Sequence, residues 1–345
     1  MLVAGNRELM ASKASAARYG LALGDALRMP SQTLSRDTIR KRYGAINDFV
    51  PPFPGHPISS GLKAAQVTDD TEQTVLLARR LIDDPDRFDE NKWAQDLLDW
   101  EKSVRQRGLF DLLGPSSKKA VEAISQGFDP EITGKNGTTN GAAMRITPVG
   151  IVSPSCDLEA LVDLVEITCR ATHNTSEAIA AAAAVAGYIS HRIDGGDHKA
   201  ALSFSLAAAE MGESRGYPCG VQNVASRITD AVALAETGVG VDAFADVIGT
   251  SVASHEAVPA AFGIMSMALG DVWCAGLLAA NIGDDTDTIG SIACAMCGAG
   301  SGMEGLKQNK IQELKSANDL NFDTLSVALV GLRQGIGSLV REGAL

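Results

Sequence analysis

The sequence is poor in aromatic residues and has no long uninterrupted apolar run. Phe, Trp and Tyr make up 5% of its 345 residues, whereas hydrophobic residues make up 45% and charged residues 21%. A chain of this composition can bury a large core, which excludes a disordered protein. Strands are enriched in aromatic residues, but this chain is rich in Ala and Gly. Helices that pack through small side chains are therefore predicted.

Basic residues are also in the minority, since 30 Lys and Arg face 42 Asp and Glu for a net charge of −12. A phosphate backbone would repel such a chain, which argues against a nucleic-acid partner. The apolar stretch 257–282 is broken by Pro259 and Asp271, so no membrane span is predicted. The N-terminus lacks a signal-peptide pattern, and we expect a cytoplasmic protein with no membrane partner.

Cysteine is sparse and irregularly spaced, with six residues in the chain. Cys294 and Cys297 form a C-x-x-C pair inside an Ala- and Gly-rich run. Neither a second pair nor a nearby His pair completes a zinc site. We expect both to be buried structural thiols.

Apolar residues recur at helical spacing along most of the chain, for example at 158, 161, 162, 165 and 169. Two Gly- or Pro-rich stretches, 42–61 and 127–139, are expected to be irregular. The pattern predicts an all-α protein, a compact bundle forming a single domain over residues 1–345. The expected helices are 9–27, 71–82, 91–107, 158–169, 177–193, 200–211, 228–237, 241–252, 259–267, 273–280, 289–303 and 322–336.

Two acidic clusters stand out, and each precedes an apolar helix. In the first, Thr68-Asp69-Asp70-Thr71-Glu72, an aspartate followed three residues later by Glu is also typical of a helix cap. The second, Asp284-Asp285-Thr286-Asp287-Thr288, holds more carboxylates than one cap needs, and such close charges repel unless a cation offsets them. Oxygen-only ligands suit Mg²⁺ or Mn²⁺. Together the clusters would form a two-metal site if the fold brings them into contact.

Other standard sites are missing. Gly298 and Gly300 begin a partial dinucleotide fingerprint, but Met303 stands where its last Gly belongs. No P-loop and no serine-hydrolase elbow occurs. Five histidines never pair at metal spacing. His173 is notable because it lies at a helix junction among polar residues, where a structural role is also open.

With these motifs in order, the sequence resembles the ADP-ribosylglycohydrolase family. Five segments carry the resemblance and span residues 20–305. They are Gly24-Asp25-Ala26-Leu27, Thr68-Asp69-Asp70-Thr71-Glu72, Asn140-Gly141-Ala142-Ala143-Met144-Arg145, Thr172-His173 and Asp285-Thr286-Asp287-Thr288-Ile289-Gly290.

The resemblance implies an orthogonal multi-helix bundle with two Mg²⁺ ions, or Mn²⁺ in their place. The implied metal ligands are Thr68, Asp69, Asp70, Asp285, Asp287 and Thr288. The implied substrate-binding residues are Asn140, Gly141, Ala142, Met144, Arg145 and His173, with His173 at the ribose or sugar-phosphate portion, and Gln32 beside them.

The implied reaction is hydrolysis of the glycosidic bond at the anomeric carbon of ribose in an ADP-ribosyl compound. A metal-bound water would attack that carbon through an oxocarbenium-like transition state, with Asp69 or Asp70 as the base. The expected partner is a small molecule or an ADP-ribosylated substrate. The oligomeric state is left open.

Three residues depart from the family pattern. Arg28 replaces a Gly, Asp284 replaces a common Gly, and Gln32 stands where several protein-directed relatives carry a Glu. An amide can bind a ligand but cannot act as a base. An N-glycosidase of a small nucleoside or ribosyl metabolite is therefore an alternative, as is a non-catalytic binding or structural protein on the same fold.

Overall fold

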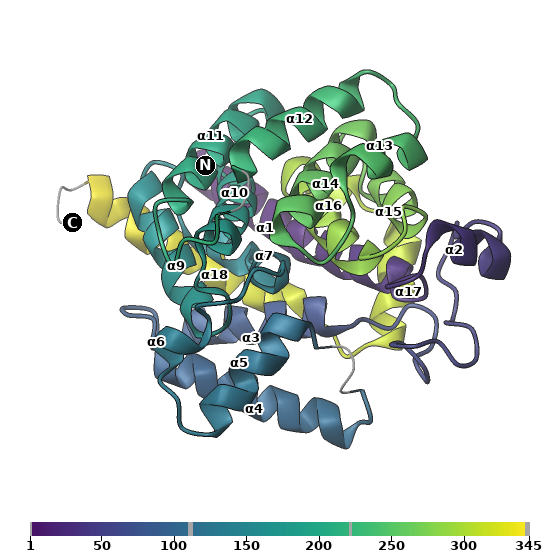
Figure 1. Cartoon of the computed structure of the whole chain (residues 1–345). Coiled ribbons are helices and arrows are strands. Elements are labelled where there is room, and N and C mark those ends of the chain that lie inside the picture. The colour runs from purple at the N-terminus through teal and green to yellow at the C-terminus, as the bar shows by residue number, and fades with distance from the viewer. Residues whose placement is uncertain (1, 110–112, 221–222, 342–345) are drawn as a thin grey trace.

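A computed structural model describes residues 2–109, 113–220 and 223–341. Within these ranges the chain is helical, with three isolated β-bridges and no strand, which confirms the all-α prediction. Figure 1 shows the helices crossing at many angles around a central pair. The elements are α1 (Leu2–Arg28), α2 (Arg36–Tyr43), α3 (Asp69–Asp83), α4 (Glu90–Gln106), α5 (Pro115–Ser125), α6 (Pro130–Thr133), α7 (Gly141–Arg145), α8 (Thr147–Val152), α9 (Leu158–His173), α10 (Ser176–Ile193), α11 (His198–Gly212), α12 (Val224–Glu236), α13 (Val241–Ile248), α14 (Ser254–Met267), α15 (Val272–Ala280), α16 (Thr286–Ser301), η2 (Met303–Gly305), α17 (Gln308–Ala317) and α18 (Phe322–Arg341).

Helices α1 and α16 form the centre of the bundle and pack at very close range. A Cβ added at Gly20 would overlap the carbonyl of Cys294, and one added at Gly24 would overlap the carbonyl of Gly290. Because the contact partner moves backward along α16 as α1 advances, the two helices run antiparallel. The end of α1 therefore lies beside the start of α16.

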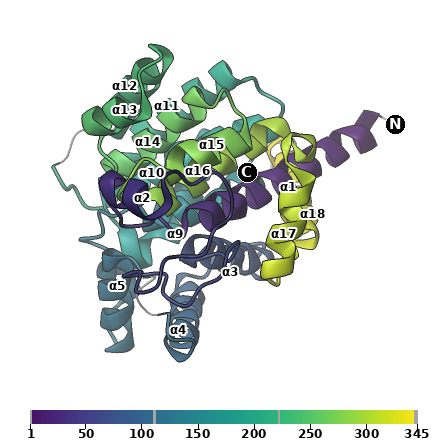
Figure 2. The same ribbon diagram turned by 90° about the vertical axis from the view of Figure 1, so that its right-hand side faces the viewer.

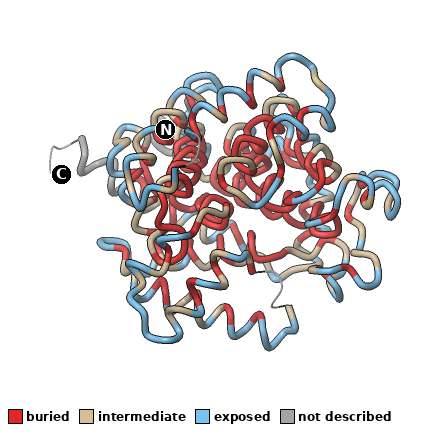
Figure 3. Tube along the Cα trace, in the orientation of Figure 1, coloured by how far each residue is buried: buried red, intermediate tan, exposed pale blue. Residues whose placement is uncertain are grey.

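The core surrounds this pair, as the buried central segments in Figure 3 show. Helix α10 is built largely of Ala and is buried along nearly its whole length. The view in Figure 2 shows α2 and the long 44–68 connection on the flank of the bundle. Among the described residues, no helix combines the length and apolar character needed to cross a membrane.

The observed helices differ from the predicted ones mainly where proline or short length obscures the pattern. Helix α14 begins at Ser254, five residues before Pro259. Proline lacks the N–H that would pair with the carbonyl of His255, and this carbonyl accepts from Nε of Arg227 instead. Helix α13 ends at Ile248, where Gly249 takes a positive φ of 86°. The short helices α2, α5, α6, α7, α8 and α17 were not predicted.

Arg28, one of the departures from the family pattern, is fully buried at the end of α1. Its Nε donates to the carbonyl of Gly276 (3.2 Å) and its Nη2 to the thiol of Cys294 (3.1 Å). Its Nη1 has no partner among the described residues. Cys294 and Cys297 are buried free thiols, as expected.

Space for this guanidinium comes from Gly290, where an added Cβ would overlap the Arg28 head group. We therefore expect Gly290→Ala to lower the free energy of unfolding by about 3 kcal/mol, the upper range for overpacking. Gly331→Ala, a helical glycine whose Cβ would meet nothing within 4 Å, should be neutral or slightly stabilising. Urea unfolding measures both, and a further Arg28→Ala substitution should restore stability to the Gly290→Ala protein. An unchanged Gly290→Ala protein would contradict this packing.

Candidate metal centre

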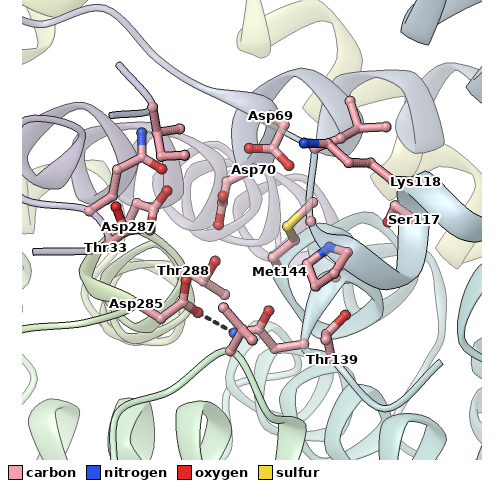
Figure 4. A pocket seen from close by; sticks show the side chains of 18 residues that line it. Thr33, Asp69, Asp70, Ser117, Lys118, Thr139, Met144, Asp285, Asp287 and Thr288 are labelled. Carbon is pink, nitrogen blue, oxygen red and sulfur yellow. Dashed lines mark hydrogen bonds between the residues drawn. The ribbon is translucent and has the colours of Figure 1, made fainter. Parts of the chain in front are cut away.

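The two acidic clusters meet at one cavity, although Asp70 and Asp285 lie about 215 positions apart. The first turns of α3 and α16 face each other across it (Figure 4). The cavity has a volume of about 280 Å³. Its wall is formed by Gln32, Thr33, Ile58, Asp69, Asp70, Leu113, Gly114, Pro115, Ser117, Lys118, Thr139, Asn140, Gly141, Met144, Val252, Asp285, Asp287 and Thr288.

Neither cluster caps its helix, so the capping interpretation of the acidic residues is wrong. Thr68 occupies the N-cap of α3 but makes no side-chain cap bond, because its hydroxyl donates to Asp25 (2.7 Å). Asp285 occupies the N-cap of α16 and likewise makes no cap bond. It accepts instead a hydrogen bond from the amide of Asn140. The carboxylates are thus directed at the cavity.

These carboxyl groups are buried and repel one another. Burial raises the pKa of Asp69, Asp70 and Asp287 well above the ordinary value, and the neighbouring carboxylates raise it further. Burial also raises the pKa of Asp285 to about 7, against the hydrogen bond from Asn140. A buried cluster of this kind favours either protonation or a bound cation.

Asp25 holds the first cluster in place from the end of α1. Its two carboxylate oxygens accept from the backbone N–H of Thr68 (2.9 and 3.1 Å) and of Thr71 (3.2 Å). They also accept from the hydroxyls of Thr68 (2.7 Å) and Thr71 (2.5 Å). Burial raises the pKa of Asp25, and these hydrogen bonds lower it in part. Asp25 therefore fixes the direction in which α3 leaves the cavity.

The donor set suits divalent cations. Asp287 lines the cavity, and its buried Oδ1 has no partner among the described residues. Carboxylate and hydroxyl oxygens are the ligands that Mg²⁺ and Mn²⁺ prefer. No three acidic, His or Cys side chains in the described ranges are already grouped closely enough to hold one ion by themselves. Binding would therefore require the carboxylates to draw together or threonine and water oxygens to complete the set.

The two aspartates of α3 are held differently. Asp70 lies 2.6 Å from the hydroxyl of Ser291, whose one proton it shares with the carbonyl of Asp287 (2.5 Å), and a hydrogen bond from Thr288 also lowers the pKa of Asp70. The side-chain donor to Asp69 among the described residues is the amide of Gln73, at a longer 3.4 Å. Asp69 is thus the less engaged of the two carboxylates.

The predicted substrate-binding residues and the predicted metal ligand Thr68 divide into two layers. Gln32, Asn140, Gly141 and Met144 line the cavity, together with the acidic residues and Thr288. The others lie behind the wall and are buried, namely Thr68, Ala142, Arg145 and His173.

Gln32, a departure from the family pattern that lines the cavity, is fixed by the 44–68 connection. Its Nε2 donates to the hydroxyl of Ser59 (2.5 Å), which in turn donates to the carbonyl of Met29 (2.8 Å). His56 accepts from the backbone N–H of Ser59 through Nδ1 (2.9 Å). The amide therefore keeps one orientation at the cavity wall.

Sequence reasoning missed several residues of the site. Asp25 belongs to a motif that carried the family resemblance but was assigned no role. Ser291 follows Asp287 by four positions on α16, so helical spacing could have placed it beside the carboxylates. Lys118 and Thr139 carry no signal in the sequence that points to the cavity.

We expect Asp25→Ala to lower the free energy of unfolding by about 3 kcal/mol, because buried donors of Thr68 and Thr71 lose their acceptor. Asp25→Asn, which keeps one acceptor oxygen, should fall between Ala and the wild type. Asp197→Ala removes an exposed carboxylate that caps α11 and should cost less stability than Asp25→Ala. Chemical denaturation compares the three variants. An Asp25→Ala protein no less stable than the Asp197→Ala protein would refute the role of Asp25.

The raised pKa values also predict a pH dependence. A carboxyl group whose pKa is higher in the folded than in the unfolded state supports folding at low pH, and this support is lost as the pH rises, for Asp285 between about 4 and 7. The metal-free protein should therefore melt at a lower temperature at about pH 8 than at about pH 5. Mg²⁺ should raise the melting temperature more at the higher pH, because its ligands must be deprotonated. Thermal melts with Na⁺ at matched ionic strength provide the control, and a larger Mg²⁺ effect at the lower pH would contradict the prediction.

The chain is similar to known proteins over most of its length. The sequence model described as ADP-ribosylglycohydrolase matches residues 6–337. The chain is 32% identical to the uncharacterized protein YegU of Escherichia coli, over 92% of this chain and 96% of that one. It is 25% identical to the ADP-ribosylarginine hydrolase Tri1 of Pseudomonas putida, over 88% and 74% of the two chains.

Among solved structures, an ADP-ribosylglycohydrolase-related protein complex superposes with a TM-score of 0.69 at 20% identity, covering 94% of this chain and 99% of that one. This likeness shows that the fold is shared. The family model matches nearly the whole length of the chain, and this match identifies the family. The chain belongs to the ADP-ribosylglycohydrolase family.

Proposed function

We propose that this protein hydrolyses the glycosidic bond at the anomeric carbon of ribose in an ADP-ribosyl compound. The observation that carries the proposal is the meeting of four buried aspartates, two from α3 and two from α16, at one cavity beside Asn140. Such a cluster of acidic groups in a cleft, with strongly raised pKa values, is typical of a catalytic site. Membership of the family supports the same reaction class.

The carboxylates of both clusters would hold two Mg²⁺ or Mn²⁺ ions, with Thr288 as a hydroxyl ligand at the cavity wall. Thr68 does not line the cavity, and it would join the ligands only through the lone pairs of a hydroxyl whose proton goes to Asp25. When bound, these ions supply Lewis acidity, which lowers the pKa of water and orients ribose hydroxyls. Asn140 donates to Asp285 and so keeps that carboxylate turned toward the cavity. Ser291 does the same for Asp70.

Asp69 is the best candidate for the general base. A carboxylate that accepts short hydrogen bonds is less basic. The hydroxyls of Ser291 and Thr288 lower the pKa of Asp70, whereas the side-chain donor to Asp69 among the described residues is the amide of Gln73, at 3.4 Å. Burial and the repulsion of Asp70 raise the pKa of Asp69, which favours proton uptake from water near neutral pH.

The opposite wall suits a phosphate-bearing substrate. The first turn of α5, with Gly114, Pro115 and Ser117, lines the cavity, and Lys118 adds a positive charge there. Backbone N–H groups at a helix N-terminus and an ammonium group both favour phosphate oxygens. This wall supports an ADP-ribosyl compound over a plain nucleoside.

One observation favours the smaller ribosyl metabolite as a second candidate. The cavity volume of about 280 Å³ lies at the lower limit of ligand pockets, about 300 Å³. A non-catalytic role is less compatible with the site, since four buried carboxylates without a function would destabilise the fold.

We expect release of ADP-ribose or ribose from at least one member of a panel of ADP-ribosylated peptide, ADP-ribose ester and nucleoside, with Mg²⁺ present. Asp285→Asn should lower the amount of bound metal and reduce the rate by at least about 100-fold. Mutation of a residue that only supports a metal ligand already reduces metal affinity or activity by about 10–100-fold. Product release is followed by chromatography and metal content by elemental analysis.

Asp271→Asn is the matched control, because Asp271 caps α15 away from the cavity and Asn caps equally well. It should leave rate and metal content unchanged. Activity that persists in excess EDTA would rule out the metal dependence, and no turnover of any panel member would rule out the proposed reaction.

A further inference from the structure

His173 is fully buried and does not reach the cavity surface, yet it is linked to the cavity by hydrogen bonds. Its Nδ1 lies 2.7 Å from the hydroxyl of Thr172, and its Nε2 lies 3.1 Å from the hydroxyl of Thr139. Thr139 does line the cavity, where Figure 4 shows it across from Asp69. The close approach of Gly141, whose added Cβ would lie 2.8 Å from the imidazole, keeps the ring in place.

The direction of this chain of hydrogen bonds is set at its buried end. Arg145 donates from Nη2 to the hydroxyl oxygen of Thr172 (2.6 Å), and a guanidinium can only donate. The Thr172 hydroxyl must then find an acceptor for its own proton. Among the described residues its one remaining partner is Nδ1 of His173. Thr172 is 1% exposed, so a proton left without an acceptor would be costly.

Nδ1 of His173 is therefore an acceptor, and Nε2 carries the ring proton. A second ring proton is disfavoured, because burial lowers the pKa of His173 well below its ordinary value and the charge of Arg145 lowers it further. Nε2–H in turn donates to the hydroxyl oxygen of Thr139. The Thr139 proton has no acceptor among the described residues.

We propose that Thr139 is a ligand-binding residue whose hydroxyl is held as a donor toward the cavity, so that it selects an oxygen acceptor on the substrate. This inference rests on the proposed function for the identity of that oxygen, which would be a ribose or phosphate oxygen. His173 acts behind Thr139 as a positioning residue.

The chain of hydrogen bonds is suited to binding and not to proton transfer. A proton leaving Thr139 would have to be replaced from His173, then from Thr172, and finally from Arg145. The guanidinium keeps its proton in proteins, so the chain cannot be refilled from its buried end. The chain of hydrogen bonds fixes the Thr139 hydroxyl as a donor, and the charge of Arg145 at its buried end strengthens that donor.

The ring proton of His173 can be located without any ligand. In ¹⁵N-labelled protein, the imidazole nitrogen shifts should show Nε2 protonated and Nδ1 unprotonated at about pH 7. Thr172→Val removes the donor to Nδ1, so the preference for the Nε2–H tautomer should weaken. A wild-type ring with Nδ1–H, or a doubly protonated ring, would overturn the assigned direction.

The role of Thr139 is tested by binding of ADP-ribose, with ribose 5-phosphate as a smaller probe, measured by calorimetry in the presence of Mg²⁺. Thr139→Val should weaken binding about tenfold, the effect of about 1.4 kcal/mol for one hydrogen bond. Thr139→Ser, which keeps the hydroxyl, should bind within about twofold of the wild type. Thr138→Val is the matched control, because Thr138 does not line the cavity.

The outcomes separate the two proposals. Equal binding by the Val and Ser variants of Thr139 would overturn the role of its hydroxyl while leaving the proposed reaction intact. A wild-type protein that binds neither probe would overturn the proposed function and the ligand role of Thr139 together, whereas the tautomer of His173 would still report on the hydrogen-bond direction.

Discussion

The close antiparallel contact between α1 and α16 is the constraint on which the site depends. Glycines at the contact let the backbone of one helix touch that of the other, as at Gly20 against Cys294. This brings the C-terminal end of α1, with Asp25, next to the N-terminal turn of α16, with Asp287. Asp25 then anchors α3 through Thr68 and Thr71. Two helix starts that are remote in sequence are thereby aimed at one cavity, and a side chain at any of these glycines would separate them.

The same convergence creates an electrostatic difficulty that the fold relieves only in part. Asp25 is satisfied by hydrogen bonds from four donor groups, but Asp287 retains an oxygen that has no partner within the described part of the chain. The buried guanidinium of Arg145 is attracted to Asp69 but forms its hydrogen bonds with Gln73 and Thr172 instead. The guanidinium of Arg145 therefore makes no hydrogen bond to these carboxylates, and their mutual repulsion is not relieved by direct contact with it. This is the physical reason to expect that metal ions form part of the stable folded state.

Much of the helical fold could be predicted from the sequence, because long amphipathic or Ala-rich segments such as those of α9 and α10 have a clear period. Short helices such as α7 and α8 could not, since a few residues define no period and their position comes from packing. The acidic clusters were visible in the sequence, yet each could equally have been a cap. What distinguishes the alternatives is that Thr68 turns to Asp25 and Asp285 turns to Asn140, and both contacts join residues that are far apart in the chain.

Gln32 shows how one substitution can change the character of such a site. A carboxylate at this position would add a further negative charge to a wall that already holds four aspartates. The amide instead donates Nε2 to Ser59 and leaves Oε1 without a donor among the described residues. One wall of the cavity thus presents acceptors, from Gln32 and the aspartates, while the other presents donors, from Ser117, Lys118 and Thr139 (Figure 4). A ligand that matches this cavity has hydroxyl groups, which donate hydrogen bonds or bind cations, at the acidic wall. At the opposite wall it has oxygen atoms that accept hydrogen bonds. A ribose whose hydroxyls meet the acidic wall and whose phosphate meets α5 satisfies both, which is why the polarity of the cavity, more than its volume, favours an ADP-ribosyl compound.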